Sequence, residues 1–384
     1  MSVAQKLAKT GPRKLLALDG GGILGVISLG YLIRLEELLR EQLKKDDSFV
    51  LADYFDYIAG TSTGAIIAAG LSLGMKAKEL LAFYVDHGKE MFDKDWIIYQ
   101  KTYNKYQGQK LTTLLQDTFG FQTNLRPVDD PSLLSKDRKE LKTLLMVVMR
   151  NATTDSPWPV SNNPGAKYNN TSRDDCNLDL PLWKLVRAST AAPTYFPPEV
   201  VSLGRNQFVF VDGGVTSFNN PALQLFLMAT VDRYNLKWPT GEDKILLVSI
   251  GTGAAPDADP RLALVNMHVY YNATRIPSAL LAAANAQQDF LCRVLGRCLH
   301  GPVIDREVND MIGSVGLGPD GFKHFTYVRY NVDLTRDGLD ALGLDKIQPA
   351  DVQAIDSVAH IGALQRIGAA AANSVSWKHF QAFP

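Results

Sequence analysis

The residues best suited to do chemistry include a serine between two glycines, in the segment Gly60-Thr-Ser-Thr-Gly64. The pattern G-x-S-x-G between a strand and a helix is typical of the nucleophile of serine hydrolases, because the two glycines leave room for a sharp turn. The residues before the serine (57–61) have the pattern of a short apolar strand, and those after it (64–73) are small and helix-like. We therefore predict that Ser62 is a nucleophile. The alternative is a glycine-lined turn in which the serine caps the helix.

A second candidate, Asp19-Gly-Gly-Gly-Ile-Leu-Gly25, follows a predicted strand and opens a predicted helix. Consecutive glycines allow a tight turn whose N–H groups can bind an anion at the helix N-terminus. Gly20, Gly22 and Gly25 also match the dinucleotide fingerprint G-x-G-x-x-G, which requires an acidic residue at the end of the next strand. Here the corresponding residues, 34–45, continue the helical pattern. An anion site, a NAD-type cofactor site and a turn without ligand all stay open for this loop.

A serine hydroxyl needs a base to accept its proton. Asp212 ends a predicted strand and precedes two glycines, so it can meet Ser62 and the glycine loop at one edge of a sheet. The alternative for Asp212 is a turn residue. None of the six histidines has such a strand-end setting, but a serine esterase with a histidine triad stays open as an alternative. They are His87, His268, His300, His324, His360 and His379.

The composition excludes several classes of protein. The chain has 384 residues, 46% of them hydrophobic and 21% charged, which is typical of a soluble globular protein. Forty basic residues balance forty acidic ones without a long run of either sign, so we expect no nucleic acid as substrate. Three cysteines without paired spacing indicate neither a disulfide framework nor a zinc site, and we expect no metal. Residues 1–14 lack the apolar core of a signal peptide, which predicts a cytoplasmic protein. The cysteines are Cys176, Cys292 and Cys298.

The elements that must position these residues alternate between short apolar runs and segments of helical period, as in βαβ units. We expect a flexible N-terminal segment at 1–13 and a single catalytic domain at 14–384, with surface insertions and a C-terminal helical extension. Strands are predicted at 14–19, 57–61, 141–150, 207–212 and 244–251, and an edge strand at 324–332. Helices are predicted at 26–43, 64–73, 76–91, 110–119, 182–189, 220–232 and 351–372. The segments 121–140, 156–179 and 254–275 are predicted to be irregular.

Five segments, in this order, resemble the patatin-like phospholipases, a family of lipid acyl hydrolases that use a Ser–Asp dyad. They are DGGGILG (19–25), GTSTG (60–64), ASTAAPTYFPP (188–198), VDGGVTSFNNPA (211–222) and SIGTG (249–253). The resemblance implies an α/β three-layer sandwich with a mixed, mostly parallel central sheet covered by helices. It covers residues 14–253, so the remaining third of the chain is interpreted from its pattern alone.

The resemblance also assigns roles to residues. It implies that Ser62 is the nucleophile, that Asp212 is its base, and that the enzyme cleaves fatty-acyl esters of membrane glycerolipids or phospholipids through an acyl-enzyme, without a cofactor. The implied oxyanion hole consists of the amides of Gly20, Gly21 and Gly22. The other motif glycines are Gly25, Gly60, Gly64, Gly213 and Gly214.

One position departs from the family pattern. Leu24 stands where the family often has Arg or Lys, so a cation that would help to bind a charged phosphate headgroup is missing. A lipid substrate also implies transient, peripheral contact with a membrane surface. The segment 92–106, with Trp96, Ile97 and Ile98 among lysines, is our candidate for that contact, and packing into the core is its alternative.

The sequence leaves three further questions open: regulation by a signal, loss of catalytic activity, and oligomeric state. Some bacterial members of the family are effectors of antiphage defence that a nucleotide signal activates, and this role stays an alternative. A catalytically silent lipid-binding protein is another. The oligomeric state is open, a homo-oligomer included.

Overall fold

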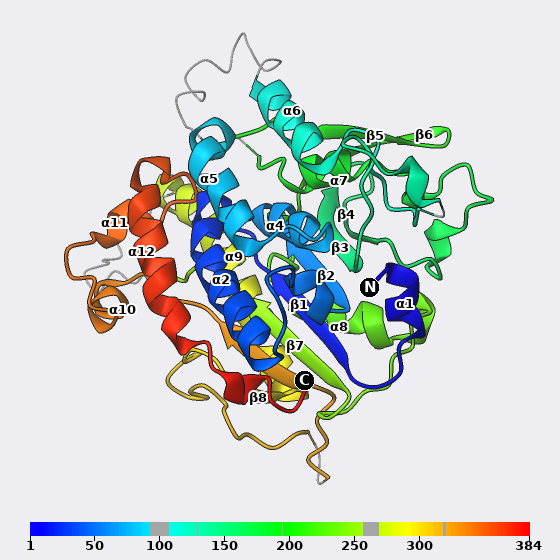
Figure 1. Ribbon diagram of the computed structural model, residues 1–384. Coiled ribbons are helices and arrows are strands. Elements are labelled where there is room, and N and C mark those ends of the chain that lie inside the picture. The colour runs from blue at the N-terminus through cyan, green and yellow to red at the C-terminus, as the bar shows by residue number, and fades with distance from the viewer. Residues whose placement is uncertain (93–106, 129, 194, 256–268, 318–319) are drawn as a thin grey trace.

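A mixed sheet forms the middle of the molecule (Figure 1). The computed structural model describes residues 1–92, 107–128, 130–193, 195–255, 269–317 and 320–384. Within them, nine strands form one sheet in the order β5-β6-β3-β2-β1-β7-β9-β8, and β4 pairs with β3 outside this path. They are β1 (Arg13–Leu18), β2 (Tyr57–Thr61), β3 (Leu144–Asn151), β4 (Ser156–Ser161), β5 (Glu199–Leu203), β6 (Asn206–Asp212), β7 (Ile245–Ile250), β8 (Arg297–His300) and β9 (Thr326–Tyr330).

Most neighbouring strands are parallel. The run from β3 through β2, β1, β7 and β9 to β8 is parallel, whereas β3–β4, β3–β6 and β5–β6 are antiparallel. Every residue of β1, β2, β7 and β9 is buried. Strands covered on both faces need apolar residues throughout rather than in alternation, which explains runs such as Leu15-Leu-Ala-Leu18. The predicted α/β class with a mixed, mostly parallel sheet is confirmed.

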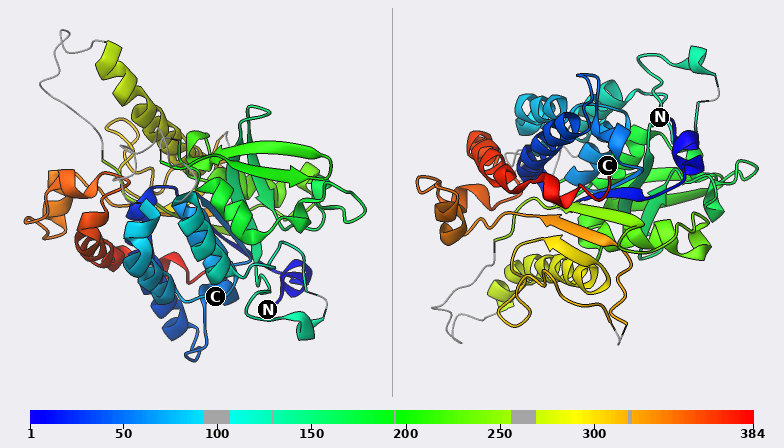
Figure 2. Two further views of the ribbon diagram at one scale, coloured as in Figure 1. Left: turned by 90° about the horizontal axis from the view of Figure 1, so that it is seen from above. Right: turned by 60° about the horizontal axis from the view of Figure 1, so that its bottom comes forward.

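Helices cover both faces of the sheet. In the right-hand view of Figure 2, α2, α5 and α12 lie on one face and α9 lies on the other. Helix α4 packs on the first face, against α2 and α5, and α8 packs beside α9 on the second. The helices are α1 (Val3–Ala8), α2 (Gly25–Gln42), α3 (Leu51–Tyr54), α4 (Thr63–Ser72), α5 (Ala77–Phe92), α6 (Gln107–Phe119), α7 (Leu182–Ser189), α8 (Ala222–Thr230), α9 (Val269–Leu295), α10 (Arg336–Ala341), α11 (Pro349–Val352) and α12 (Ile361–Ala371). None of the described helices is long and apolar enough to cross a membrane.

Strand β3 brings two distant segments together at one edge. Its residues 146–151 pair with β4, so β4 occupies one edge of β3 along most of its length. On the other edge β2 pairs with residues 144–148, and β6 pairs with residues 149–151. Strand β6 therefore enters from the opposite direction where β2 stops. Thr61 pairs with Val148 and Asp212 with Met149, so the residue after Thr61 arrives at the level of Asp212.

Several expected elements differ from the structure. The segment predicted as an edge strand at 324–332 contains β9, which lies between β7 and β8. Residues 156–161, expected to be irregular, form β4. The closing helix expected at 351–372 is divided into α11 and α12. In place of a flexible segment at 1–13, the structure has α1, whose Lys6 is buried and donates a hydrogen bond to the carbonyl of Phe55 at 2.7 Å.

Candidate active site

Ser62 occupies a strained turn between β2 and α4. Its φ of 54° and ψ of −122° lie in a region of backbone angles that residues other than glycine rarely adopt. Such a conformation costs about 1–3 kcal/mol. The flanking glycines make the turn feasible. A Cβ added at Gly60 would collide with the carbonyl oxygen of Gly64, and one added at Gly64 would collide with the carbonyl oxygen of Leu18. The G-x-S-x-G segment therefore forms a sharp turn at the end of a strand, with the geometry that is typical of a nucleophile elbow.

The hydroxyl of Ser62 is bonded to the carboxylate of Asp212. Ser62 Oγ donates to Asp212 Oδ2 at 2.7 Å, although 150 residues separate the two in the sequence. The other oxygen, Asp212 Oδ1, accepts from the Gly214 amide at 2.6 Å. The backbone N–H of Asp212 donates to the Ala191 carbonyl at 3.0 Å. Both carboxylate oxygens and the main chain of Asp212 are thus held in place around the serine.

Burial changes the acidity of Asp212, which is 5% exposed. It raises the pKa of the carboxyl to about 6, while the hydrogen bonds from Ser62 and from the Gly214 amide and the charge of Arg187 lower it. A base works best when its pKa is near the working pH, because it is then both ionised and able to accept a proton. The carboxylate is therefore a better base for a hydroxyl than an exposed aspartate.

Ser189, at the end of α7, also contacts the elbow. Its Oγ accepts a hydrogen bond from the Ser62 amide at 2.9 Å and donates one to the Val148 carbonyl at 2.6 Å. Ser189 thus links the elbow to β3 and helps to hold the strained backbone of Ser62. It was missed as a site residue. Its place in the segment 188–198 is the only signal in the sequence, and that segment does not indicate a contact with Ser62.

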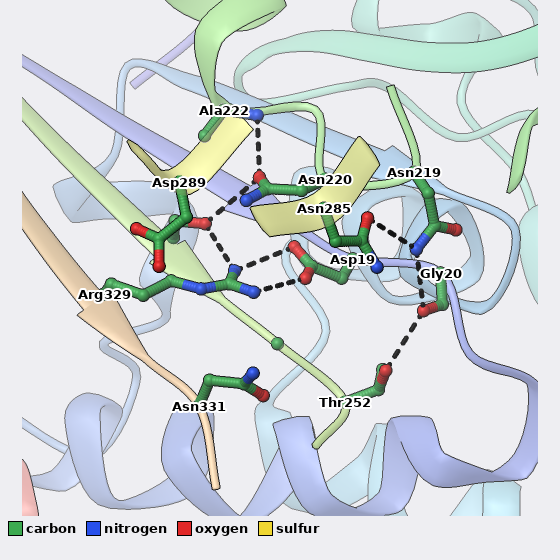
Figure 3. Close-up of polar contacts among 12 residues, drawn as sticks. Asp19, Gly20, Asn219, Asn220, Ala222, Thr252, Asn285, Asp289, Arg329 and Asn331 are labelled. Carbon is green, nitrogen blue, oxygen red and sulfur yellow. Dashed lines mark hydrogen bonds and ion pairs between the residues drawn. The ribbon is translucent and has the colours of Figure 1, made fainter. Parts of the chain in front are cut away.

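The glycine loop lies beside Ser62, since a Cβ added at Gly20 would be 3.3 Å from Ser62 Cβ. The amide of Gly20 already donates to the Asn219 carbonyl at 3.1 Å, so it is not free for an oxyanion. Thr252 Oγ1 donates to the Gly20 carbonyl at 3.0 Å (Figure 3). In the described part of the chain, the amides of Gly21 and Gly22 have no recorded partner. Of the three amides expected to form an oxyanion hole, the Gly20 amide is therefore already bonded, and binding of an oxyanion by the other two stays a prediction.

Two alternatives from the sequence, a dinucleotide site and a histidine triad, find no support in the geometry of the described residues. Helix α2 continues to Gln42, so no strand with a terminal acidic residue follows the glycine loop at the distance that a dinucleotide site requires. Hydrogen bonds of Ser62 and Asp212 within the described residues involve no histidine. The described histidines contact other residues, and His268 lies outside the described part. The contacts are His87 with Glu90, His300 with His379, His324 with Phe226, and His360 with Asp351.

Other predicted features are placed as follows. Leu24 is 5% exposed, so it belongs to the core. The predicted membrane-contact residues Trp96, Ile97 and Ile98 lie outside the described residues. Among the residues that the structure describes, no three His, Cys, Asp or Glu side chains gather as metal ligands. The described cysteines Cys176, Cys292 and Cys298 are buried and free.

Comparison with known protein families identifies one that matches more than half of the chain. The family model described as "Patatin-like phospholipase" matches residues 16–226. Patatin-17 of Solanum cardiophyllum is 31% identical over 263 residues, which cover 64% of this chain and 61% of that protein. An intracellular phospholipase A2 of Caenorhabditis elegans is 32% identical over 251 residues, covering 63% of this chain and 20% of that protein. Among solved structures, VipD from Legionella pneumophila has 15% identity and a TM-score of 0.33, covering 93% of this chain and 67% of VipD.

Proposed function

The chain belongs to the patatin-like phospholipase family, and from this premise we propose that it is a lipid acyl hydrolase that uses Ser62 and Asp212. One observation carries the proposal. Ser62 Oγ lies 2.7 Å from Asp212 Oδ2, in an elbow with a positive φ and beside a glycine loop. The substrates we propose are fatty-acyl esters of membrane glycerolipids. The matched segment spans 61% of the length of Patatin-17, so we take no substrate from that relative.

In the first half of the proposed reaction, Ser62 Oγ attacks the ester carbonyl carbon and Asp212 accepts the hydroxyl proton. The carbonyl oxygen becomes an oxyanion, to which the Gly21 and Gly22 amides can donate. Loss of one such donor typically costs about 3 kcal/mol in the transition state. As the C–O bond of the ester breaks, the protonated Asp212 returns its proton to the leaving alcohol or lysolipid. The fatty acyl group then remains on Ser62.

In the second half, water replaces the alcohol. Asp212 accepts a proton from the water as its oxygen attacks the acyl carbon, and the same amides receive the second oxyanion. The Ser62 oxygen leaves and takes the proton from Asp212, which releases the fatty acid and restores the starting state. One carboxylate therefore acts as base and acid in turn, which a pKa of about 6 favours.

The lipid must be reached at a membrane surface, and we propose peripheral contact from the cytoplasmic side. Leu24 leaves the usual basic position of the family without a cation. We therefore expect weaker discrimination in favour of anionic headgroups than in members with Arg or Lys there.

The test compares Ser62→Ala with Ser72→Ala in full-length protein. Ser72 is a matched control, because it is a buried serine at the other end of α4 and its Oγ accepts from Thr143 Oγ1 at 2.9 Å. Liposomes of phosphatidylethanolamine and phosphatidylglycerol are analysed by lipid mass spectrometry before and after incubation. We expect wild type and Ser72→Ala to release fatty acid and lysolipid, and Ser62→Ala to lose at least about 10³-fold in turnover.

A fluorophosphonate probe gives a second reading on the same proteins. It should label wild type and Ser72→Ala at Ser62 and leave Ser62→Ala unlabelled. Turnover above a few per cent of wild type in Ser62→Ala, in a sample free of contaminating esterase, would remove Ser62 from the mechanism.

A further inference from the structure

A buried ion pair includes the residue that directly precedes the glycine loop in the sequence (Figure 3). Arg329 Nη1 donates to Asp19 Oδ1 at 2.9 Å and Arg329 Nη2 donates to Asp19 Oδ2 at 2.6 Å. Both side chains are 4% exposed. Asp19 is the residue before Gly20, and Arg329 lies in β9, more than a hundred residues beyond the match to the family model at 16–226.

We propose that Arg329 is a positioning residue for the oxyanion hole, because its fork turns both oxygens of Asp19 towards β9 and so keeps the Gly21 amide free for substrate. The inference rests on the proposed function. Arg329 does not touch the reacting atoms; it acts through Asp19. A forked guanidinium suits this role because it binds both oxygens of one carboxylate in a fixed plane.

A second Asp-Gly-Gly segment of this chain indicates which contact Asp19 would make without Arg329. The sequence Asp-Gly-Gly occurs at 19–21 and again at 212–214. In the second copy, Asp212 Oδ1 accepts the amide of Gly214, two residues on, at 2.6 Å. This is the usual Asx turn of aspartate, in which the side chain binds the backbone two residues later. Exposed aspartates such as Asp46 and Asp130 make the same contact with Ser48 and Ser132.

The corresponding contact at the first copy would join Asp19 to the Gly21 amide, which is one of the two free donors of the proposed oxyanion hole. With Arg329 in place, the structure instead uses both Asp19 oxygens in the ion pair. The same sequence therefore gives an Asx turn at the base and an open amide at the oxyanion hole. The arginine from β9 makes the difference.

The pair is also fixed relative to the rest of the loop. Arg329 Nη1 donates to Ser249 Oγ in β7 at 2.7 Å, and the Asp19 amide donates to the Ile250 carbonyl at 3.1 Å. The chain after β7 supplies Thr252, whose Oγ1 holds the Gly20 carbonyl at 3.0 Å. Residues at the end of β7 and directly after it thus bind both Asp19 and Gly20. Arg329 is bonded to the same strand as well as to Asp19.

A second buried pair provides a matched control. Arg293 binds both oxygens of Asp289 at 2.9 and 2.6 Å, and the Arg293 side chain is fully buried. This pair lies within α9, and none of its hydrogen bonds goes to the described residues of the glycine loop. The charge of Asp289 does act on Asp19 and Arg329, and lysine at position 293 keeps the positive charge that faces it. Arg293→Lys and Arg329→Lys therefore weaken the same kind of buried ion pair. Only the pair of Arg329 contains Asp19.

The experiment measures kcat and KM for p-nitrophenyl butyrate in full-length Arg329→Lys, Arg329→Met, Arg293→Lys and Asp19→Ala/Arg329→Met. Fluorophosphonate titration carried to completion counts the active sites, so turnover is expressed per folded site.

We expect Arg329→Met to lose about 10²-fold in kcat with KM little changed, and Arg329→Lys to lose less. Arg293→Lys should keep wild-type kcat per site even if its melting temperature falls. The double variant lacks the carboxylate that captures the amide, and it should recover at least about tenfold of the kcat lost in Arg329→Met.

An activity-independent measurement separates this inference from the proposed function. The Gly21 and Gly22 amide resonances of ¹⁵N-glycine-labelled protein should move in Arg329→Met, stay in place in Arg293→Lys and return towards wild type in the double variant. Wild-type kcat per site in Arg329→Met, unmoved amide resonances, or a double variant no better than the single one would overturn the role of Arg329. Turnover that survives in Ser62→Ala would instead overturn the proposed function and leave the amide test intact.

Discussion

In the proposed reaction the carboxylate of Asp212 has to be charged to act as a base, and it is buried. Burial raises its pKa from an ordinary value near 3.8 to about 6, a change that corresponds to about 3 kcal/mol. Because the pKa is higher in the folded than in the unfolded state, this group favours folding below pH 4, and that contribution is lost as the pH rises through 6. At neutral pH the charged Asp212 carboxylate therefore lowers the free energy of unfolding.

Asp212→Asn should separate activity from stability. Asparagine keeps one acceptor oxygen for the Gly214 amide and turns its NH2 donor towards Ser62 Oγ. It cannot take up a proton, so kcat should fall by about 10²- to 10⁴-fold. At pH 8 the variant should be more stable than wild type by up to about 3 kcal/mol, and the difference should disappear near pH 4. Urea unfolding at the two pH values measures this change.

The pH dependence of the wild type gives the control for this prediction. For a soluble ester, kcat/KM should rise with pH through about 6, because Asp212 must be ionised. Asp243→Asn removes an exposed aspartate paired with Lys244 and should change neither the profile nor the stability difference. A flat profile between pH 4.5 and 8, or an active Asp212→Asn beside an inactive histidine variant, would contradict the assignment.

Single residues differ in how far the sequence reveals them. The contact of Ser62 with Asp212 could be predicted, because each stands at a strand end before or between glycines, which is a local pattern. The bond that occupies the Gly20 amide could not, since it comes from Asn219. Ser189 and Arg329 reach the site across 127 and 310 residues of sequence. Their roles depend on tertiary contacts that no local pattern encodes.

At the scale of elements, the contact of α4 with β1 depends on a glycine. Gly64 lies in the first turn of α4, and an added Cβ would be 2.7 Å from the Asp19 carbonyl oxygen as well as against Leu18. Gly64→Ala should therefore lower the free energy of unfolding by about 1–3 kcal/mol and reduce kcat, because α4 carries Ser62 at its start. Urea unfolding and esterase turnover measure the two effects.

Gly362→Ala is the matched control for this helix. Gly362 lies in the first turn of α12, and an added Cβ would meet nothing within 4 Å. Alanine there should be neutral or should stabilise the protein by up to about 1 kcal/mol, because it costs less backbone entropy in a helix. Equal effects of the two substitutions would mean that α4 can move away from β1 without loss.

Elements with strong local patterns could be predicted, and the others could not. Strands β1, β2 and β7 are buried apolar runs, and their predicted positions agree with the structure to within a residue or two. Strand β4 was missed because Pro157 and Pro159 argue against a strand; it tolerates them because it lies at an edge and pairs with β3 alone. Strand β8 has four residues, too few to show a period. Without β8, the neighbouring β9 looked like an edge strand.

The whole molecule is joined across its first and last parts. An added Cβ at Gly30 in α2 would lie 2.7 Å from the Gly368 Cα in α12, so the two helix backbones are in close contact. Tyr54 Oη donates to the Phe383 carbonyl at 2.7 Å, close to the C-terminal end. One apolar cluster runs from Val3 to Phe383 among the described residues. The residues beyond the family match are therefore part of the core that supports the site.

This continuity predicts the effect of shortening the chain to residues 1–255. The truncation removes β8, β9, α9 and α12, so β7 becomes an edge strand with its apolar residues uncovered on that side. It also removes Arg329 and leaves Asp19 without its partner, which alone typically costs about 3–5 kcal/mol. The loss of apolar burial adds to this cost, whereas the usual stability of a domain is only about 5–15 kcal/mol. The fragment should therefore be insoluble or unfolded by circular dichroism, and it should not react with a fluorophosphonate.

Co-expression of 269–384 as a separate chain should restore soluble protein and labelling of Ser62, because the missing strands and the arginine are supplied again. A folded, labelled 1–255 fragment would mean that the site is complete without the C-terminal third.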